Sequence, residues 1–247
     1  MKQKTIEERF HLARHDLSLV VIEGFHPLKH AIRFGAELLE VVSPSPKDLA
    51  ALQSEYAPDI GNTIADLVTA VPGDVFEKLA PVSPPTRVLA IARRPAVDIA
   101  ALMHDPAPAP VVLLENPRNL FNIGAAVRAS AAAGAAGLVN TGNLDPWKPG
   151  ALTTGVGLQF AIPVARIETV PDCDRPLVAV DLGGDPLPGF RVPDRALLAF
   201  GTERQGLSRE VLDAADFQVS IPMENGVSSL NLATSVAVVL YHWKLAQ

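Results

Sequence analysis

Cysteine is almost absent from this chain, because Cys173 is the only one among 247 residues. A single cysteine excludes an intramolecular disulfide and is typical of proteins that work in a reducing compartment. Together with six scattered histidines it offers no zinc-ligand spacing, so the sequence predicts no metal site.

Long apolar runs are missing as well. A membrane-spanning helix needs roughly 18–20 consecutive apolar residues, and the Ala-rich run 125–139 is shorter and carries Arg128. Residues 1–8 are rich in charge and contain no apolar signal region. These absences predict a cytoplasmic protein that does not associate with membranes.

Aromatic residues and positive charge are both scarce. Two Trp and two Tyr leave few platforms for stacking single-stranded bases. The net charge of −6 argues against a highly basic nucleic-acid coat protein, although a local basic patch would still permit an enzyme that acts on RNA. The chain does have an apolar fraction of 48% and a charged fraction of 19%, which is typical of a globular protein.

Prolines mark a boundary at residues 105–110, where every second residue is proline. Each proline fixes φ and biases its predecessor toward extended backbone. We therefore expect two domains, residues 1–105 and residues 106–247. In the first domain, apolar runs and breakers predict strands at 19–22, 38–42 and 88–91 and helices at 27–34 and 46–56.

The second domain repeats this alternation with more continuous apolar strands. Strands are predicted at 111–114, 137–140, 177–180, 196–200 and 218–221, and helices at 123–134 and 230–244. Such strands suit a sheet covered on both faces. The alternation predicts an α/β fold with a mostly parallel sheet, and ligands of such sheets bind beyond the carboxyl ends of the strands.

Three polar blocks each follow a predicted strand. The first runs from Asn122 to Arg128 and opens a helix that we expect Asn122 to cap. The second spans residues 200–207 and the third residues 221–231. We expect the last two strand ends to lie side by side and to form a ligand site from backbone atoms. Taken alone, each block is better explained as an ordinary loop and helix start.

The third block contains the signals that end a strand and begin a helix. Pro222 ends the strand because it lacks an N–H donor. Glu224-Asn225-Gly226 is typical of a turn. Ser228 or Ser229 is expected to cap the final helix, with Asn231 in its first turn.

Taken in order, the three blocks resemble those of the SpoU-type (TrmH-like) branch of the SPOUT RNA methyltransferases. That family carries N-x-G-x-x-x-R, then F/L-G-x-E-x-x-G-L, then I-P-M with a following S-L-N. The chain has Asn122 to Arg128, Phe200 to Leu207, and Ile221-Pro222-Met223 with Ser229-Leu230-Asn231. The resemblance implies a trefoil-knotted sheet, bound S-adenosylmethionine, a homodimer and methylation of a ribose 2′-hydroxyl in rRNA or tRNA.

The same resemblance assigns residues to the site. It implies cofactor contacts at Leu198, Phe200, Gly201, Gly206, Ile221, Met223, Ser229 and Leu230. It implies catalytic roles for Arg128, Asn122, Glu203, Ser229 and Asn231. Asn122 and Ser229 would position the hydroxyl, and Glu203 would hold Arg128 or Asn231.

Arg128 is the family's candidate for the base, and it would act near the cofactor of the partner subunit. Because a guanidinium normally stays protonated, we favour a role in orienting the ribose or stabilising developing negative charge over literal deprotonation. Arg118 is a candidate contact for an RNA phosphate.

The first domain carries a second resemblance. Residues 23–31 and 38–42 are similar to the small substrate-binding domain that often precedes this fold, which itself resembles ribosomal RNA-binding proteins.

Three other function classes share some of these features. An RNA-binding protein with a non-catalytic cofactor site would carry the same blocks. A dehydrogenase would need Gly-x-Gly-x-x-Gly after its first strand, and Gly155-Val156-Gly157 lacks the third glycine. A conventional Rossmann methyltransferase would need an acid at a strand end; Asp181 stands at such a place, but the glycine-rich first loop is missing.

Overall fold

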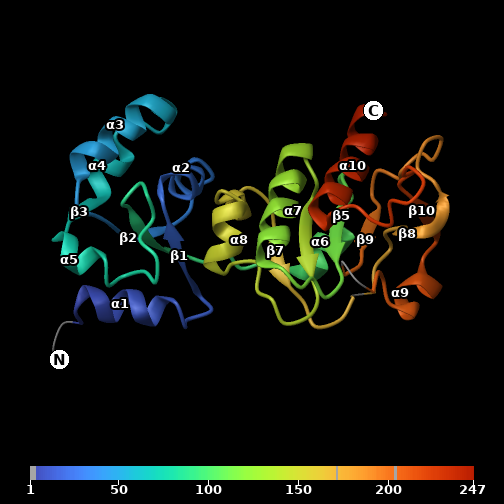
Figure 1. The fold of residues 1–247 in the computed structure, drawn as a ribbon, viewed down its shortest axis with the longest axis horizontal. Coiled ribbons are helices and arrows are strands. Elements are labelled where there is room, and N and C mark those ends of the chain that lie inside the picture. Colours follow the sequence, from blue (N-terminus) through green and yellow to red (C-terminus); the bar gives the residue numbers. More distant parts are fainter. Residues whose placement is uncertain (1–3, 171, 203–204) are drawn as a thin grey trace. The chain divides into compact units, whose positions relative to one another are not determined.

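The structure, a computed structural model, describes residues 4–170, 172–202 and 205–247 (Figure 1). Its contacts divide the chain into two compact units. The N-terminal unit consists of Met1–Ala96 and Trp147–Ala161, and the C-terminal unit of Val97–Pro146 and Ile162–Gln247. Residues 147–161, which we expected in the second domain, thus lie in the N-terminal unit. The predicted boundary between the two functional domains, after residue 105, stays a prediction.

The N-terminal unit is built on a four-stranded sheet with the order β1-β4-β2-β3. Its strands are β1 (Leu19–Glu23), β2 (Leu38–Ser43), β3 (Val68–Ala70) and β4 (Leu89–Arg93). β4 pairs antiparallel with β1 and β2, while β3 adds in parallel to β2. The three strands predicted from apolar runs are confirmed, and β3 is an addition.

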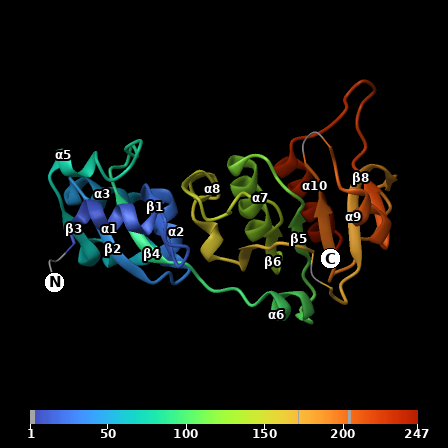
Figure 2. The same ribbon diagram turned by 90° about the horizontal axis from the view of Figure 1, so that it is seen from below.

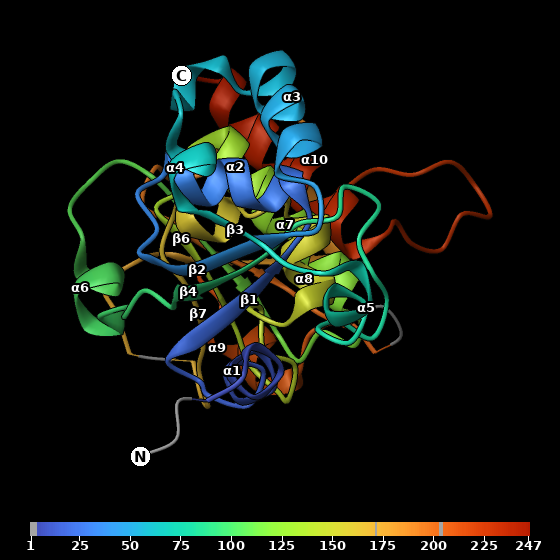
Figure 3. The same cartoon turned by 90° about the vertical axis from the view of Figure 1, so that its left-hand side faces the viewer.

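Helices cover both faces of this sheet, with α1 on one side and α2 and α3 on the other (Figure 3). They are α1 (Ile6–Ala13), α2 (Phe25–Arg33), α3 (Pro46–Tyr56), η1 (Pro58–Ile60), α4 (Thr63–Leu67) and α5 (Gly73–Phe76). The predicted helices correspond to α2 and α3. Phe10 of α1 and Phe76 of α5 pack with Val21, Val42 and Leu89 of the sheet.

The segment 147–161 contributes α8 (Pro149–Thr154) and η2 (Leu158–Phe160) to the N-terminal unit. His30 Nδ1 of α2 lies 2.6 Å from the Val156 carbonyl oxygen. Gly157 has φ +76°, and a Cβ there would lie 2.4 Å from the Pro27 carbonyl oxygen. The segment is therefore packed closely against α2, and the contact requires a glycine at position 157.

The C-terminal unit is built on a six-stranded parallel sheet with the order β10-β8-β9-β5-β6-β7. Its strands are β5 (Val111–Leu114), β6 (Gly137–Asn140), β7 (Val164–Arg166), β8 (Leu177–Pro186), β9 (Leu197–Phe200) and β10 (Phe217–Ser220). The predicted α/β class and parallel sheet are confirmed. β7 was not predicted.

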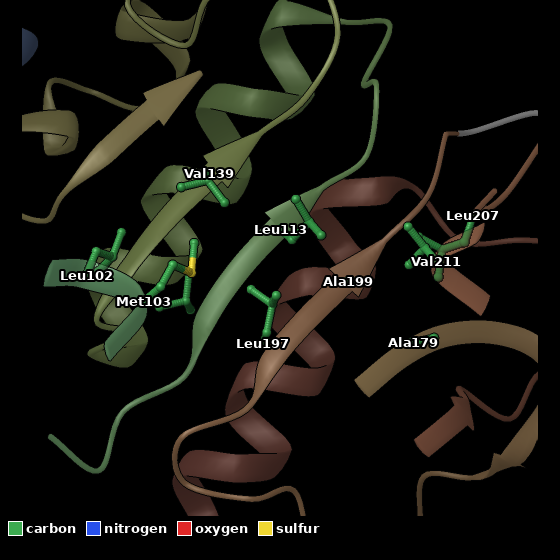
Figure 4. Packing of buried hydrophobic residues seen from close by; sticks show 10 residues of the cluster. Leu102, Met103, Leu113, Val139, Ala179, Leu197, Ala199, Leu207 and Val211 are labelled. Atoms are coloured by element: carbon green, nitrogen blue, oxygen red, sulfur yellow. The ribbon is translucent and has the colours of Figure 1, made fainter. Parts of the chain in front are cut away.

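Two pairs of helices cover this sheet. α7 (Leu120–Ala133) and α10 (Leu232–Leu245) pack side by side on one face (Figure 1), where Lys244 Nζ donates to the Ala133 carbonyl over 2.9 Å. α6 (Ile99–His104) and α9 (Arg209–Ala214) cover the other. Figure 4 views this second face, where Met103, Leu113 and Val211 belong to one buried cluster.

Arg175 fastens the start of the C-terminal unit. Its side chain is 3% exposed and donates to the carbonyl oxygens of Leu102, Met103, Asp105, Ala109 and Arg195. Three of these acceptors lie at or just beyond the end of α6, where the helix dipole favours a cation. Burial lowers the pKa of Arg175, but so strong a base stays protonated. The proline-rich segment 105–110 is thus tied to the core.

Candidate active site

A cavity of about 310 Å³ lies at the carboxyl ends of β8, β9 and β10. Its lining contains seven of the eight predicted cofactor residues: Phe200, Gly201, Gly206, Ile221, Met223, Ser229 and Leu230. The eighth, Leu198, is fully buried within β9 and is not in the lining. The volume is in the range of small-molecule sites in proteins.

The ends of β9 and β10 do not lie side by side, and this part of our expectation is wrong. β8 lies between them in the sheet. Val180, Asp181 and Leu182 of β8 therefore form a third wall of the cavity. The sequence signal was an acid followed by Gly183-Gly184 at the end of an apolar strand, and this signal belonged to none of the three blocks.

A register shift between β8 and β10 leaves these β8 residues unpaired with β10. Gln218 of β10 pairs with Ala179, but the next residue, Val219, pairs with Asp185, so residues 180–184 bulge between them. Gly184 permits the bulge, because a Cβ there would lie 2.4 Å from the Val219 amide nitrogen. The bulge carries the carboxylate of Asp181 into the cavity wall.

The second block folds back on itself after β9. Thr202 and Gly206 exchange backbone hydrogen bonds of 3.0 and 3.1 Å. A Cβ at Gly201 would lie 2.0 Å from the carbonyl carbon of Gly206, so the glycine is required by the chain's own close approach. Glu203, a predicted catalytic residue between these positions, lies outside the described residues.

The first block begins inside α7 and does not cap it. Asn119 is the N-cap, and its Oδ1 accepts from the Phe121 amide over 2.8 Å. The expectation that Asn122 caps the helix is wrong, because the helix begins at residue 120 and a cap residue must precede it. The side chain of Asn122 is thereby available for contacts outside its own helix.

The third block also begins its helix later than expected. α10 starts at residue 232, and its N-cap is Asn231, whose Oδ1 accepts from the amides of Ala233 and Thr234. Ser228 and Ser229 do not cap it; both line the cavity instead. The block forms an exposed loop between β10 and α10, which projects from the unit (Figure 2).

Asn231 joins the first and third blocks. Its Nδ2 donates to Asn122 Oδ1 over 2.9 Å. Arg128 is exposed two turns along α7, does not line the cavity, and has no hydrogen-bond or ion-pair partner among the residues that the structure describes. Arg118 is exposed on the loop before α7. A single chain thus brings seven predicted cofactor residues together at the cavity and pairs Asn122 with Asn231, but it does not bring Arg128 to the cavity.

The model of the SpoU rRNA Methylase family matches residues 109–241, which include all three blocks. This chain belongs to the SpoU rRNA methylase family. The 23S rRNA (adenosine(1067)-2′-O)-methyltransferase of Streptomyces laurentii is 30% identical to this SpoU family member over 247 residues, covering 90% of this chain and 84% of the relative. The 23S rRNA (uridine(2479)-2′-O)-methyltransferase of Streptomyces viridochromogenes is 27% identical over 242 residues, covering 90% and 80%.

Solved structures share the fold of this SpoU family member over almost its whole length. The SpoU methyltransferase AviRb of Streptomyces viridochromogenes, in complex with AdoMet, matches with a TM-score of 0.80 at 22% identity, covering 99% of this chain and 98% of that one. The AdoMet-bound rRNA methyltransferase of Sinorhizobium meliloti matches with a TM-score of 0.79 at 23% identity, covering 98% and 95%. The family resemblance stated from the three blocks is confirmed.

Among the described residues, no group of three or more His, Cys, Asp or Glu side chains is placed to hold a metal ion. No helix in the described part of the chain is long and apolar enough to cross a membrane.

Proposed function

We propose that this SpoU family member transfers a methyl group from S-adenosylmethionine to a ribose 2′-hydroxyl of ribosomal RNA. The observation that carries the proposal is the cavity at the ends of β8, β9 and β10, whose lining contains seven predicted cofactor residues. Ribosomal RNA is preferred to tRNA because three relatives that each match 90% or more of this chain are named 23S rRNA 2′-O-methyltransferases.

The residues present fit the cofactor. Phe200, Ile221, Met223 and Leu230 give the cavity apolar walls for an adenine ring, and Thr202 and three serines in its lining offer polar groups for hydrogen bonds. When bound, S-adenosylmethionine supplies a methyl group that is already activated by a positively charged sulfur. The protein's remaining task is to position and polarise a weakly acidic ribose hydroxyl.

The asparagine pair supplies positioning. Both polar atoms of the Asn231 amide are engaged, with Oδ1 on the α10 backbone and Nδ2 on Asn122. Asn231 is therefore a fixed support that orients the half-buried Asn122 at the start of α7. We assign to Asn122 and Ser229 the placement of the ribose hydroxyl, and to Asn231 the placement of Asn122.

Arg128 is assigned the electrostatic part of the reaction. A guanidinium stays protonated in proteins, so we assign it the orientation of the ribose and the stabilisation of negative charge that develops on the attacking oxygen. Such a role requires that Arg128 reach a cavity, and it does not line the cavity of its own chain.

A homodimer would meet this requirement by bringing Arg128 of one subunit to the cavity of the other. Its support is an exposed apolar stripe on α10, where Val238, Tyr241 and Leu245 are 37%, 40% and 82% exposed. Spacings of three and four residues place these side chains on one face of the helix. Phe121 at the start of α7 is 61% exposed. Apolar surface of this kind is typical of a subunit interface.

The trefoil knot and the location belong to the same proposal. The loop between β8 and β9 is fastened to α10, since Trp243 Nε1 donates to Asp194 Oδ1 over 3.1 Å and His242 Nε2 lies 2.8 Å from the Phe190 carbonyl oxygen. These contacts hold α10 against that loop, and we propose that the C-terminal segment is threaded into a knot. With ribosomal RNA as the proposed substrate, we propose that the protein works in the cytoplasm. RNA binding by the N-terminal unit stays a prediction.

The deciding experiment measures methyl transfer to ribosomal RNA and calorimetric affinity for S-adenosylmethionine in parallel. Arg128→Ala should lower the transfer rate by about 10²–10³-fold and leave cofactor affinity within a few-fold. Arg209→Ala removes an equally exposed arginine from α9 and should leave both unchanged.

Two results would count against the proposal. Full activity of Arg128→Ala would remove Arg128 from the mechanism. Wild-type protein that binds RNA but transfers no methyl group would favour the alternative, an RNA-binding protein with a non-catalytic cofactor site. Mapping of 2′-O-methylation across total RNA, with and without the gene, would identify the nucleotide.

A further inference from the structure

The proposed cofactor cavity has a simple charge pattern. Among its described lining residues, Asp181 carries the one charged side chain; the others are apolar residues, glycines, Thr202 and three serines. A lone carboxylate in such a wall is unusual, because a partly buried charge costs free energy unless a partner compensates it. The pattern therefore calls for a positively charged occupant.

The carboxylate of Asp181 is held in a defined place. Its Oδ2 accepts a hydrogen bond of 3.0 Å from the amide of Gly183, within the bulge of β8. Its Oδ1 lies toward Gly206 in the neighbouring wall, where an added Cβ would be 3.5 Å away. Asp181 thus lies between the walls formed by β8 and the loop after β9, with one oxygen free of protein donors in the described residues.

The cofactor of such a methyltransferase and the product formed from it differ in charge more than in shape. At neutral pH S-adenosylmethionine carries a sulfonium, an ammonium and a carboxylate, which gives a net charge of +1. S-adenosylhomocysteine, the product, lacks the methyl group and the sulfonium charge and is neutral overall. All other groups are shared, so shape and hydrogen bonding alone discriminate poorly between the two.

We propose that Asp181 is the specificity-determining residue by which the cavity prefers the sulfonium-bearing cofactor to its neutral product. The inference rests on the proposed function. Because Asp181 lines the cavity, the proposal places the sulfonium of a bound cofactor near its carboxylate. At a separation of roughly 8 Å, with an effective dielectric between those of protein and water, one unit charge changes affinity by roughly tenfold. Loss of the charge on methyl transfer then favours release of the product.

The test is calorimetric titration of the full-length protein with S-adenosylmethionine and with S-adenosylhomocysteine at low ionic strength. Asp181→Asn keeps the size of the side chain and removes its charge. We expect its affinity for S-adenosylmethionine to fall about tenfold and its affinity for S-adenosylhomocysteine to change less than threefold. Added salt should reduce the preference of the wild type and leave that of the variant unchanged.

Two matched variants separate the effect of the Asp181 charge from any structural effect of the substitution. Asp185→Asn removes a carboxylate from the same strand that is exposed and outside the cavity lining, and it should alter neither affinity. Asp181→Glu retains the charge and should retain the preference for the cofactor even where both affinities shift. The melting temperature of each variant, compared with wild type, reports whether it is folded.

Each other outcome has a distinct meaning. Equal weakening of both ligands in Asp181→Asn overturns the inference, because the carboxylate would then contact a part that they share, either the adenosine or the amino-acid ammonium. Unchanged affinities overturn it as well. Wild-type protein that binds neither ligand contradicts the proposed function itself, and the inference fails with it.

Discussion

Asn231 donates from Nδ2 to Asn122 Oδ1 over 2.9 Å, while its own Oδ1 caps α10. One side chain thus fixes the first turn of the last helix and orients a candidate catalytic residue on α7. Both helices lie on the same face of the sheet. A small displacement of Asn231 would therefore disturb the start of both α7 and α10. The two functions of this side chain can be separated by substitution.

Asn231→Asp should separate capping from positioning. Aspartate caps helices about as well as asparagine, so the free energy of unfolding should stay within about 0.5 kcal/mol of wild type. The donor to Asn122 is lost, and we expect methyl transfer to fall at least about tenfold, the effect of roughly 1.4 kcal/mol. Urea unfolding and the rate of transfer measure the two effects.

Asn119→Ala is the control for this substitution. It removes the cap of α7 but no contact between helices, so it should cost about 1 kcal/mol of stability and leave the rate per folded molecule unchanged. Full activity of Asn231→Asp would show that the hydrogen bond does not position Asn122.

Gly157→Ala tests the packing of residues 147–161 against α2. The added methyl would lie 2.4 Å from the Pro27 carbonyl oxygen, and φ is +76°. Gly35 has almost the same φ, +75°, with open space around it. Gly35→Ala should cost about 1–2 kcal/mol from backbone strain alone. Gly157→Ala should cost about 1–3 kcal/mol more, from overpacking. Equal losses in urea unfolding would contradict the close contact.

His30 makes the N-terminal unit sensitive to acid. Burial lowers its pKa below the usual 6.5, and the nearby Lys29 and Arg33 act in the same direction, against the hydrogen bond to Val156. The unfolded chain therefore binds more protons than the folded chain just below pH 6.5, so stability is complete above this pH and falls below it. Asp59 and Asp174 have pKa values lowered from 3.8 and act only at lower pH.

The measurement for His30 compares unfolding at pH 7.5 and pH 5.5. His30→Asn places an amide N–H near the position of the ring Nδ1 and does not titrate, so it should lose less stability on acidification than the wild type. An identical loss in both proteins would assign the acid sensitivity to other groups.

Arg175 should be a major contributor to the stability of the C-terminal unit. Arg175→Met leaves buried carbonyl groups without a donor, and each costs about 1 kcal/mol or more; we expect a loss of at least about 3 kcal/mol. Arg195→Met removes a half-exposed arginine that pairs with Asp174 at the surface, and its cost should be about 1 kcal/mol or less. Similar losses for the two variants would contradict the structural role of Arg175.

The parts of this fold that sequence predicted are those governed by local chemistry. Apolar runs located the strands of the parallel sheet to within a residue or two at most ends, except the long extension of β8 and the unpredicted β7. Seven of the eight predicted cofactor residues line one cavity because the second and third blocks directly follow strands. Leu198 does not line it because it lies inside β9, with its side chain fully buried.

The parts that failed depend on the order of strands and on single-residue registers. No local pattern in residues 197–221 indicates that β8 lies between β9 and β10. The sequence therefore did not predict Asp181 as part of the cavity wall. The two helix caps were misplaced because Asn119 and Asn231 compete with equally good cap residues a few positions away. No local signal reveals that residues 147–161 leave the domain that surrounds them in sequence.

Residues 147–161 determine when the N-terminal unit can finish folding during synthesis. The chain passes between its two units three times, at 96/97, 146/147 and 161/162. A ribosome that has finished residue 96 has not yet supplied α8 and η2, the pieces that pack on α2. Synthesis of residues 97–161 takes about 3–13 s at about 5–20 residues per second. The surface of α2 that receives Gly157 therefore stays uncovered on the nascent chain for that interval, and the first unit completes its folding only after residues 97–146 of the second have been made.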